Sequence, residues 1–409
     1  MNAIDIKTAF FIAYKTISKG HKSTVALIVF ILSLSFFNLM FVSGFLSGFS
    51  SGITQSLIDT TTAHITIMPQ EEPTQKEFIS DQDDIRAQVQ TIPGVIATAS
   101  HYQLWGSISY DKEHNGKLRH VSAPVIGVTQ SEEKSVLKVH DSIVYGEFPD
   151  DLNGDEVVLG ANLSGGFGAK QVTDLGGAKV GEKVQITYAN GRVRTYTIKG
   201  IFDIVLGEVG GAAFISTKEA EAVLSTYNNA SEILVRVDLR ENTLETYVDR
   251  IKMILPHLRI ETYPARTSTV GEIVAAFDTI AFIVSIISII VAAITIFVMI
   301  YVNAVSKRRQ IGILKAIGIK EGIIEVSYIM QSFFYAFFGV VIGLMIIFFA
   351  VIPFLAARPI SMPFGNASLV YTSLGIFINI ASLIIAGILA GFIPAKIVAR
   401  ENILKSIWG

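Results

Sequence analysis

Few residues of this 409-residue chain are arranged for catalytic or metal chemistry. Its seven histidines are scattered, and none stands in the His-Glu-x-x-His spacing that holds zinc on one helix face. The chain has no cysteine, which excludes disulfides, thiolate metal ligands and a cysteine nucleophile. We therefore expect no catalytic residues and no metal site.

A phosphate-binding loop is also absent from the sequence. Such a loop reads Gly-x-x-x-x-Gly-Lys-Ser/Thr, follows a strand and opens a soluble helix. The segments SKGHKST (18–24) and GGFGAK (165–170) lack this order, and the first runs into an apolar stretch. The chain is therefore expected to hydrolyse no ATP by this route, to be no enzyme and to hold no cofactor itself.

Acidic residues give only weak signals. Asp278 and Glu325 lie near the ends of long apolar stretches, where contact with water costs little, so a proton or ion role has little support. The acidic run 150–156 is typical of a solvated turn. An enzymatic function is therefore the weakest of three functions that we consider; the other two are described at the end of this section.

The composition indicates a membrane protein. Hydrophobic residues make up 51% of the chain, charged residues 17%, and the mean hydropathy is +0.51, whereas soluble domains carry about 25% charge. With a net charge of −2, no nucleic-acid partner is expected. A helix needs about 20 apolar residues to cross a bilayer. Four uncharged runs meet this requirement and predict transmembrane helices over 24–48, 273–304, 323–352 and 372–395.

The distribution of Lys and Arg predicts the orientation of these helices. Basic residues precede the first helix, lie between the second and third, and follow the fourth, whereas the loop 353–371 carries Arg358 alone. Because short cytoplasmic loops are rich in Lys and Arg, both termini are expected in the cytoplasm. The protein is thus a multi-pass protein of the inner (plasma) membrane, with residues 50–270 outside.

Residues 50–270 read as a mixed soluble domain. Period-2 hydrophobicity over 182–203 surrounds Asn190-Gly191, the strongest short hairpin signal. Helices are predicted over 216–227, which opens with the capping residue Ser216, and over 241–255, which ends at Pro256. We expect an α+β domain.

The fold class is therefore an integral membrane α-helical bundle of four transmembrane helices, with a large α+β extracytoplasmic domain inserted between helices 1 and 2. The expected domains are 1–49, an N-terminal cytoplasmic amphipathic segment and helix 1; 50–270, the extracytoplasmic domain; and 271–409, helices 2–4 with a cytoplasmic helix over 307–322.

The segment SKRRQIGILKAIGIKEG (306–322) places basic residues between two membrane-length stretches. It consists of helix formers and predicts a short amphipathic helix at the cytoplasmic surface, with Ile311, Leu314 and Ile317 on or near one face. Its charges are also explained by anchoring of the two flanking helices. Charge alone leaves both roles open.

The order of the residues resembles a known family. The run 307–344, with its basic start, IGILKAIG and spaced glycines, is similar to the permease subunits of the MacB/FtsX/lipoprotein-releasing (Lol) superfamily of ABC transporters, the type VII or mechanotransmission class. The close PAKIVARENILKSI (394–407) is also similar. FIAYKTISKG and GITQSLIDTTTAHITIMPQ, on either side of the first helix, look most like the lipoprotein-releasing subgroup. VVLGANLSGGFGA and KVGEKVQI extend the resemblance, more weakly, to a MacB-like periplasmic core over 50–270.

The resemblance implies that the short cytoplasmic helix is a coupling helix that docks on an ABC ATPase. The implied ATPase-coupling residues are Lys307, Arg308, Arg309, Ile311, Ile313, Leu314, Lys315 and Ile317. The implied partners are an ABC ATPase dimer, a second permease (identical or similar), membrane lipids and an extracytoplasmic carrier or adaptor. The Gly-rich stretch 164–181 is a candidate for recruiting that carrier.

The first helix carries rows of residues at i, i+4 spacing. A glycine row lets another helix backbone approach closely, and the phenylalanines form a parallel row. The rows either pack inside the chain against the second helix or face a lipid-like cargo. The residues concerned are Phe37, Phe41, Gly44, Phe45, Gly48, Phe49 and Gly52.

Two functions remain from this reasoning. The first is a permease that couples ATP hydrolysis by a separate ATPase to movements outside the membrane, and so moves or releases a lipoprotein, a lipid-like molecule or another amphiphile. The alternative is an FtsX-like regulator that transmits the same motions to a cell-wall hydrolase without transport. The length of the outer region, about 220 residues, favours the first.

Overall fold

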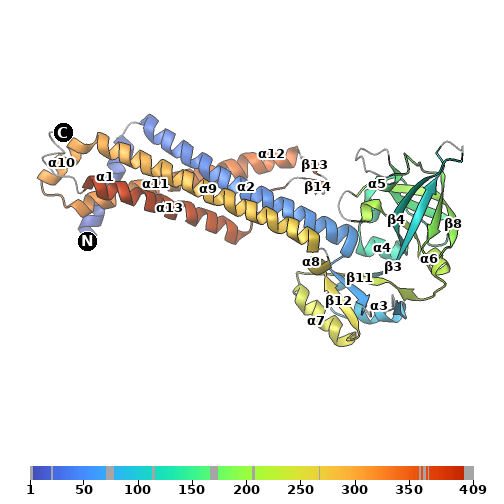
Figure 1. The fold of residues 1–409 in the computed structure, drawn as a ribbon. Coiled ribbons are helices and arrows are strands. Elements are labelled where there is room, and N and C mark those ends of the chain that lie inside the picture. The colour runs from blue at the N-terminus through green and yellow to red at the C-terminus, as the bar shows by residue number, and fades with distance from the viewer. Residues whose placement is uncertain are drawn as a thin grey trace. The chain divides into compact units, whose positions relative to one another are not determined.

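The computed structural model describes residues 3–19, 22–70, 78–112, 116–165, 174–204, 208–266, 268–358, 361–362, 365–366 and 368–399. The chain forms two compact units (Figure 1). Unit 1 comprises residues 1–51, 274–361 and 366–409, and unit 2 comprises 52–273 with 362–365.

Unit 1 is helical. Among the described residues, four helical stretches that lie mainly in this unit are long and apolar enough to cross a membrane: Lys22–Thr62, Val274–Ser306, Glu321–Ala357 and Ser373–Ile397. They agree with the four predicted from the uncharged runs. The helices are α1 (Ala3–Lys19), α2 (Lys22–Leu57), α9 (Ser268–Ser306), α10 (Arg308–Ala316), α11 (Glu321–Ile346), the π-helix η4 (Ile347–Val351), α12 (Ile352–Ala357) and α13 (Ser373–Ala399).

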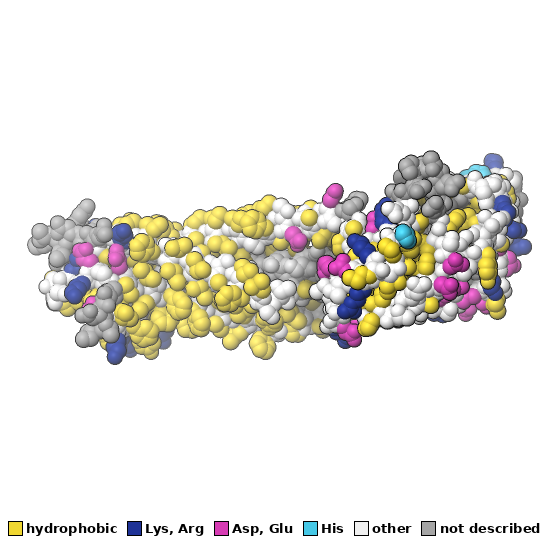
Figure 2. All heavy atoms as spheres, turned by 90° about the horizontal axis from the view of Figure 1, so that it is seen from below, with side chains coloured by type: hydrophobic (Ala, Val, Ile, Leu, Met, Phe, Trp, Pro, Cys, Tyr) yellow, Lys and Arg dark blue, Asp and Glu magenta, His cyan; other side chains and the backbone are white. Residues whose placement is uncertain are grey.

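Small residues bring the long helices of unit 1 together. A Cβ on Gly339 of α11 would lie 2.8 Å from Leu32 Cβ of α2, and one on Gly343 would lie 2.7 Å from Phe36. Because these positions carry no side chain, α2 and α11 approach closely. Hydrophobic side chains cover much of the visible outer face of this unit (Figure 2), as expected for helices surrounded by lipid.

Unit 2 is built on one large sheet whose strands run in the order β12-β1-β11-β3-β4-β9-β6-β8-β5, with β7 paired to β3 and β8. The strands are β1 (Ile65–Pro69), β3 (Val95–Tyr110), β4 (Arg119–Val128), β5 (Ile143–Gly146), β6 (Glu156–Gly160), β7 (Lys183–Tyr188), β8 (Val193–Phe202), β9 (Ala213–Ser216), β11 (Glu232–Val237) and β12 (Leu258–Thr262). Two-residue strands form two further pairs: β2 (Ile79–Ser80) with β10 (Asn229–Ala230), and β13 (Ser361–Met362) with β14 (Gly365–Asn366).

Unit 2 also contains short helices. They are the π-helix η1 (Ile58–Thr62), α3 (Gln82–Gln90), α4 (Gln130–Val136), the 3-10 helix η2 (Val139–Ser142), α5 (Ala161–Ser164), the 3-10 helix η3 (Glu208–Gly211), α6 (Thr217–Leu224), α7 (Leu244–Ile254) and α8 (Tyr263–Arg266). The α+β expectation for this region therefore agrees with the structure.

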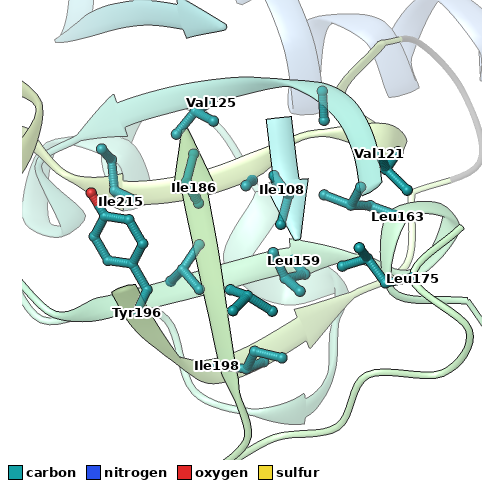
Figure 3. Packing of buried hydrophobic residues seen from close by; sticks show 14 of the residues in the cluster. Ile108, Val121, Val125, Leu159, Leu163, Leu175, Ile186, Tyr196, Ile198 and Ile215 are labelled. Atoms are coloured by element: carbon teal, nitrogen blue, oxygen red, sulfur yellow. The ribbon is translucent and has the colours of Figure 1, made fainter. Parts of the chain in front are cut away.

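Strand β3 contributes to more than one hydrophobic core of unit 2. Its first half pairs with β11, whereas its second half pairs with β4 and β7. Ile108 of the second half packs with Ile186 of β7 and Tyr196 of β8 in the core shown in Figure 3. Another core, formed by β1, β11, α3 and α7, lies near the first half.

Local signals in the sequence of unit 2 gave the right elements. The hairpin around Asn190-Gly191 is confirmed, since β7 and β8 pair antiparallel and Gly191 has φ +81. Ser216 caps α6 and accepts a hydrogen bond from Glu219 N. The helix predicted over 241–255 begins later, at Leu244, because Thr243 is its capping residue.

Candidate functional site

Helix α10 lies between α9 and α11, in the segment where the sequence predicted an amphipathic helix. It spans nine residues, and Gly318 ends it with φ +95. Gly318 N donates to Lys315 O (3.0 Å) and Ile319 N donates to Leu314 O (3.1 Å). This pair of bonds closes helices that end in a left-handed glycine. The IG in the run KAIGIK is therefore a helix terminator that turns the chain back towards α11.

The apolar residues of α10 point in two directions. Ile311 is 4% exposed and packs in the core of unit 1, whereas Ile313 is 50% exposed and Ile317 is 71% exposed. Residues four apart lie on the same helix face, so Arg309, Ile313 and Ile317 share an outward face. The sequence placed Ile311 with Ile317 on or near one face; the structure places Ile311 inward, and Leu314 between the two.

The basic residues of α10 also differ in their surroundings. Lys307 stands at the break between α9 and α10 and is partly buried, which lowers the pKa of its ammonium group. Arg308 is half-buried and Arg309 is exposed. Basic side chains gather at the end of unit 1 at which Figure 1 places α1 and α10 (Figure 2). Of Lys307, Arg308 and Arg309, only Arg309 lies on the outward face.

Lys315 differs from the other basic residues of this segment, because its side chain is only 7% exposed. Its Nζ lies 2.8 Å from Glu321 Oε1 at the start of α11 and donates to Ala399 O, 2.8 Å away, at the end of the described part of α13. A cation at the C-terminal carbonyls of a helix is favourable. Lys315 thus joins α10 to α11 and α13.

The glycines of α2 contact the segment before α13. Gly44 and Gly48 are buried; a Cβ on Gly44 would overlap the ring of Tyr371, and one on Gly48 would overlap the carbonyl oxygen of Ser368. Val370 N donates to Gly44 O (3.1 Å). The partner of these two glycines is therefore the non-helical segment before α13, whereas the packing alternative placed it in the second helix. Gly52 is half-buried.

The phenylalanines of α2 stack on one another. Ring centroids are 5.5 Å apart for Phe37 and Phe41 and 6.0 Å apart for Phe41 and Phe45, and Phe49 meets Phe277 of α9 edge to face at 4.6 Å. All four rings are half-buried. The row is thus partly engaged within unit 1, and one side of it is open to a further apolar contact.

Polar residues inside the long helices contact neighbouring helices. Ser288 Oγ of α9 donates to Asn38 Oδ1 of α2 (2.9 Å), and Asn379 Nδ2 of α13 lies 3.4 Å from Met40 Sδ. Asp278 is exposed. Among the residues that the structure describes, no group of three His, Cys, Asp or Glu is placed to hold a metal ion.

Sequence reasoning missed the partners of these residues. Ser368 and Tyr371 lie more than 300 positions after the glycines that they contact, and no local pattern links Lys315 to Ala399. Two further expectations fall outside the described residues. These are the middle of the Gly-rich stretch 164–181, at 166–173, and the basic tail from 400 onward.

Two models of known protein families match the chain, each over a different region. The model of the MacB-like periplasmic core domain matches residues 25–253, and that of the FtsX-like permease C-terminal matches residues 282–403. No curated protein sequence matches the chain.

Two solved structures resemble part of the chain. The periplasmic region of MacB from Actinobacillus actinomycetemcomitans has 11% identity and a TM-score of 0.36, over 53% of this chain and 95% of that one. The extracellular domain of the noncanonic ABC-type transporter YknZ from Gram-positive bacteria has 13% identity and a TM-score of 0.34, over 49% and 100%. At these scores the structural likeness supports no statement about activity.

The family models carry the assignment instead. The first alone covers more than half of the sequence, and the second covers most of α9 and all of α10 to α13. The four membrane-length helices and the β-rich unit are the architecture that these families share. The chain therefore belongs to the MacB/FtsX superfamily and is a membrane-embedded permease component of an ABC transporter.

Proposed function

We propose that this permease carries movements of a separate ABC ATPase through α10 and the long helices to unit 2 outside the membrane. Unit 2 is then an extracytoplasmic domain inserted between the first and second transmembrane helices. Permeases of this superfamily work with an ABC ATPase and often form dimers. A dimeric ATPase and a second permease are therefore the partners of this chain.

One observation carries this proposal. The outward face of α10 exposes Ile313 and Ile317 beside Arg309, while Ile311 and Lys315 hold the opposite face on the bundle. Anchoring of two spans needs only charge near the headgroups and does not by itself require the exposed apolar pair Ile313 and Ile317. An apolar centre with a basic rim is the composition of a protein-docking surface.

The cargo that we propose is a lipoprotein, a lipid-like molecule or another amphiphile. Exposed apolar side chains line α9 and α13, among them Phe282, Ile286 and Phe377, and the phenylalanine row of α2 is half-buried. An amphiphile in the membrane can approach such surfaces from the side. A soluble extracytoplasmic carrier would then accept the apolar part of the cargo.

Regulation of a cell-wall hydrolase is the second candidate, since it needs the same coupling path without a cargo. The two functions separate in proteoliposomes that contain the permease and its ATPase. ATP-dependent release of a labelled lipoprotein supports transport. ATP-dependent activation of a hydrolase bound to unit 2, with no release, supports regulation.

Orientation can be tested with single cysteines, because the chain has none of its own. Tyr227 of unit 2 is 83% exposed, and Gln310 of α10 is exposed. In intact cells we expect a membrane-impermeant maleimide to label Tyr227→Cys fully and Gln310→Cys only after permeabilisation. Labelling of Gln310→Cys alone would place α10 outside and refute the proposed path.

Lys315 provides a test of how α10 is held. Lys315→Met keeps the length of the side chain but leaves the buried carbonyl of Ala399 without its donor, which costs about 1–3 kcal/mol. Loss of the ion pair with Glu321 adds little, because the side chain of Glu321 is 53% exposed. We expect a lower melting temperature and reduced ATPase stimulation, while the ATPase still co-purifies. Lys320→Met is the matched control, since Lys320 is exposed. Equal behaviour of the two variants would contradict the positioning role.

A further inference from the structure

The chain enters and leaves unit 2 through two short junctions, and each carries one charged residue that is fixed to the sheet. The entering junction is η1, which follows α2 and carries Asp59. The leaving junction is α8, which ends at Arg266, just before α9. Both residues belong to unit 2, and both pair with side chains of strand β11.

The entering junction is fixed through Arg236 of β11. Asp59 Oδ1 lies 2.7 Å from Arg236 Nη2, and Arg236 Nη1 donates to Val136 O at the end of α4, also over 2.7 Å. Lys138, two residues after α4, adds a contact of 3.0 Å to Asp59 Oδ2. Its backbone N donates to Asp59 O (2.6 Å). The entering junction is thereby connected to the C-terminal end of α4.

The leaving junction reaches the same helix through a buried chain of alternating charges. Arg266 Nη2 lies 2.5 Å from Glu232 Oε2 of β11. Glu232 Oε1 lies 3.5 Å from His101 Nδ1 of β3, and His101 Nε2 lies 2.8 Å from Glu133 Oε2 of α4. The side chains of Glu133, His101 and Glu232 are 1%, 4% and 5% exposed. The leaving junction is thereby connected to the middle of α4.

The charges in this second chain compensate one another. Burial alone would lower the pKa of His101, but the carboxylates of Glu133 and Glu232 raise it to about 10, so the imidazole is positively charged at neutral pH. Burial alone would raise the pKa of Glu232, but hydrogen bonding to His101 and the charge of Arg266 bring it below its usual range. Two acidic side chains thus alternate with two basic ones.

Stability alone does not explain so many buried charges. The cost of removing ions from water often exceeds their mutual attraction, and apolar residues of similar volume often serve stability as well or better. Directional bonds instead fix the relative positions of the elements that they join. Among the described residues, Glu133 Oε1 has no hydrogen-bond partner, so the bond to His101 is what holds this carboxylate.

We propose that α4 is the element of unit 2 that follows displacement at both junctions, with Arg236 and His101 as the positioning residues that transmit it. Movement of either junction pulls on β11 and, through these two side chains, on α4. This inference deepens the proposed function, which supplies the source of the displacement. The connection itself belongs to the permease and can be tested without an ATPase.

Hydrogen–deuterium exchange on the full chain in detergent tests the connection. The reporters are the α4 amides of Glu133 and Leu137, which donate to Thr129 O (2.9 Å) and Glu133 O (2.8 Å). Arg266→Gln removes the junction cation without touching α4, and we expect it to raise exchange at α4 about tenfold, as for residues that share one network. Arg240→Gln is the control, because Arg240 is 90% exposed and pairs with Asp238.

The same substitution in a second variant separates transmission through His101 from general destabilisation of unit 2. His101→Leu/Glu133→Leu removes the connection between β3 and α4 with apolar side chains and is expected to keep the fold. In this background Arg266→Gln should no longer change exchange at α4. An equal rise in both backgrounds, or no rise in either, would overturn the proposal. Glu133→Gln, a smaller change, replaces the double variant if that one unfolds.

Discussion

Replacing Gly48 with leucine should destabilise the permease and reduce its assembly with the ATPase. A Cβ at this position would overlap the backbone oxygen of Ser368, and backbone cannot give way as a flexible side chain can. Overpacking of a close contact costs about 1–3 kcal/mol. We expect a melting temperature in detergent lower by several degrees and reduced assembly with the ATPase, measured by thermal unfolding and size-exclusion chromatography.

Ser47→Leu is the matched control, because Ser47 is the preceding residue of α2 and is exposed. It adds a comparable side chain to the same helix where nothing opposes it, so it should behave as the wild type. Gly48→Ala should also lower the melting temperature, because its Cβ already meets Ser368. The loss should be smaller than for Gly48→Leu, because alanine adds a single methyl group. If Gly48→Leu and Ser47→Leu have the same melting temperature, α2 is not packed against this segment.

Truncating the outward face of α10 should weaken binding of the ATPase while the permease stays folded. Ile313 and Ile317 are the exposed apolar residues of this face, and loss of an interface anchor typically costs more than about 1 kcal/mol. For Ile313→Ala/Ile317→Ala we expect at least about tenfold weaker binding and a matching loss of stimulated ATP hydrolysis. Purified permease and ATPase, titrated against each other, give both quantities.

Ile294→Ala is the control for this experiment, because Ile294 is a 57% exposed isoleucine within the span of α9. Arg309→Glu should weaken the same complex in a salt-dependent way, since exposed charges are screened over about 8–10 Å at ordinary ionic strength. Unchanged binding by the double variant would assign docking to another surface, such as α1, and α10 would then be an anchor.

The membrane helices and several elements of unit 2 could be predicted because their signals are local. An uncharged run of membrane length is sufficient to predict a span, and Asn190-Gly191 between two alternating stretches is sufficient to predict the β7–β8 hairpin. The amphipathic pattern of 307–322 likewise gave a helix, and α10 lies there. It did not show which apolar residues face outward, because Ile311 is turned inward by packing against the bundle.

The remaining features depend on contacts between distant parts of the chain. The glycine row of α2 predicted a close approach but not its partner, since Ser368 is brought there by the path of the chain before α13. His101, Glu133 and Glu232 are far apart in sequence, and each looks like an ordinary polar residue until the sheet places β3 beside β11. Pairing between distant parts of the chain leaves no local periodicity in the sequence from which it could be predicted.

The pairing of β1 with β12 has a consequence for how such chains diversify. These two strands, the first and last of the large sheet, lie side by side at one of its edges, with Ile65 opposite Thr262, and Tyr263 N donates to His64 O (3.1 Å). Neighbouring chain ends are what allow a domain to be inserted into another protein without disturbing it. The ends of this sheet therefore have the geometry with which a domain can be inserted into, or removed from, a longer chain.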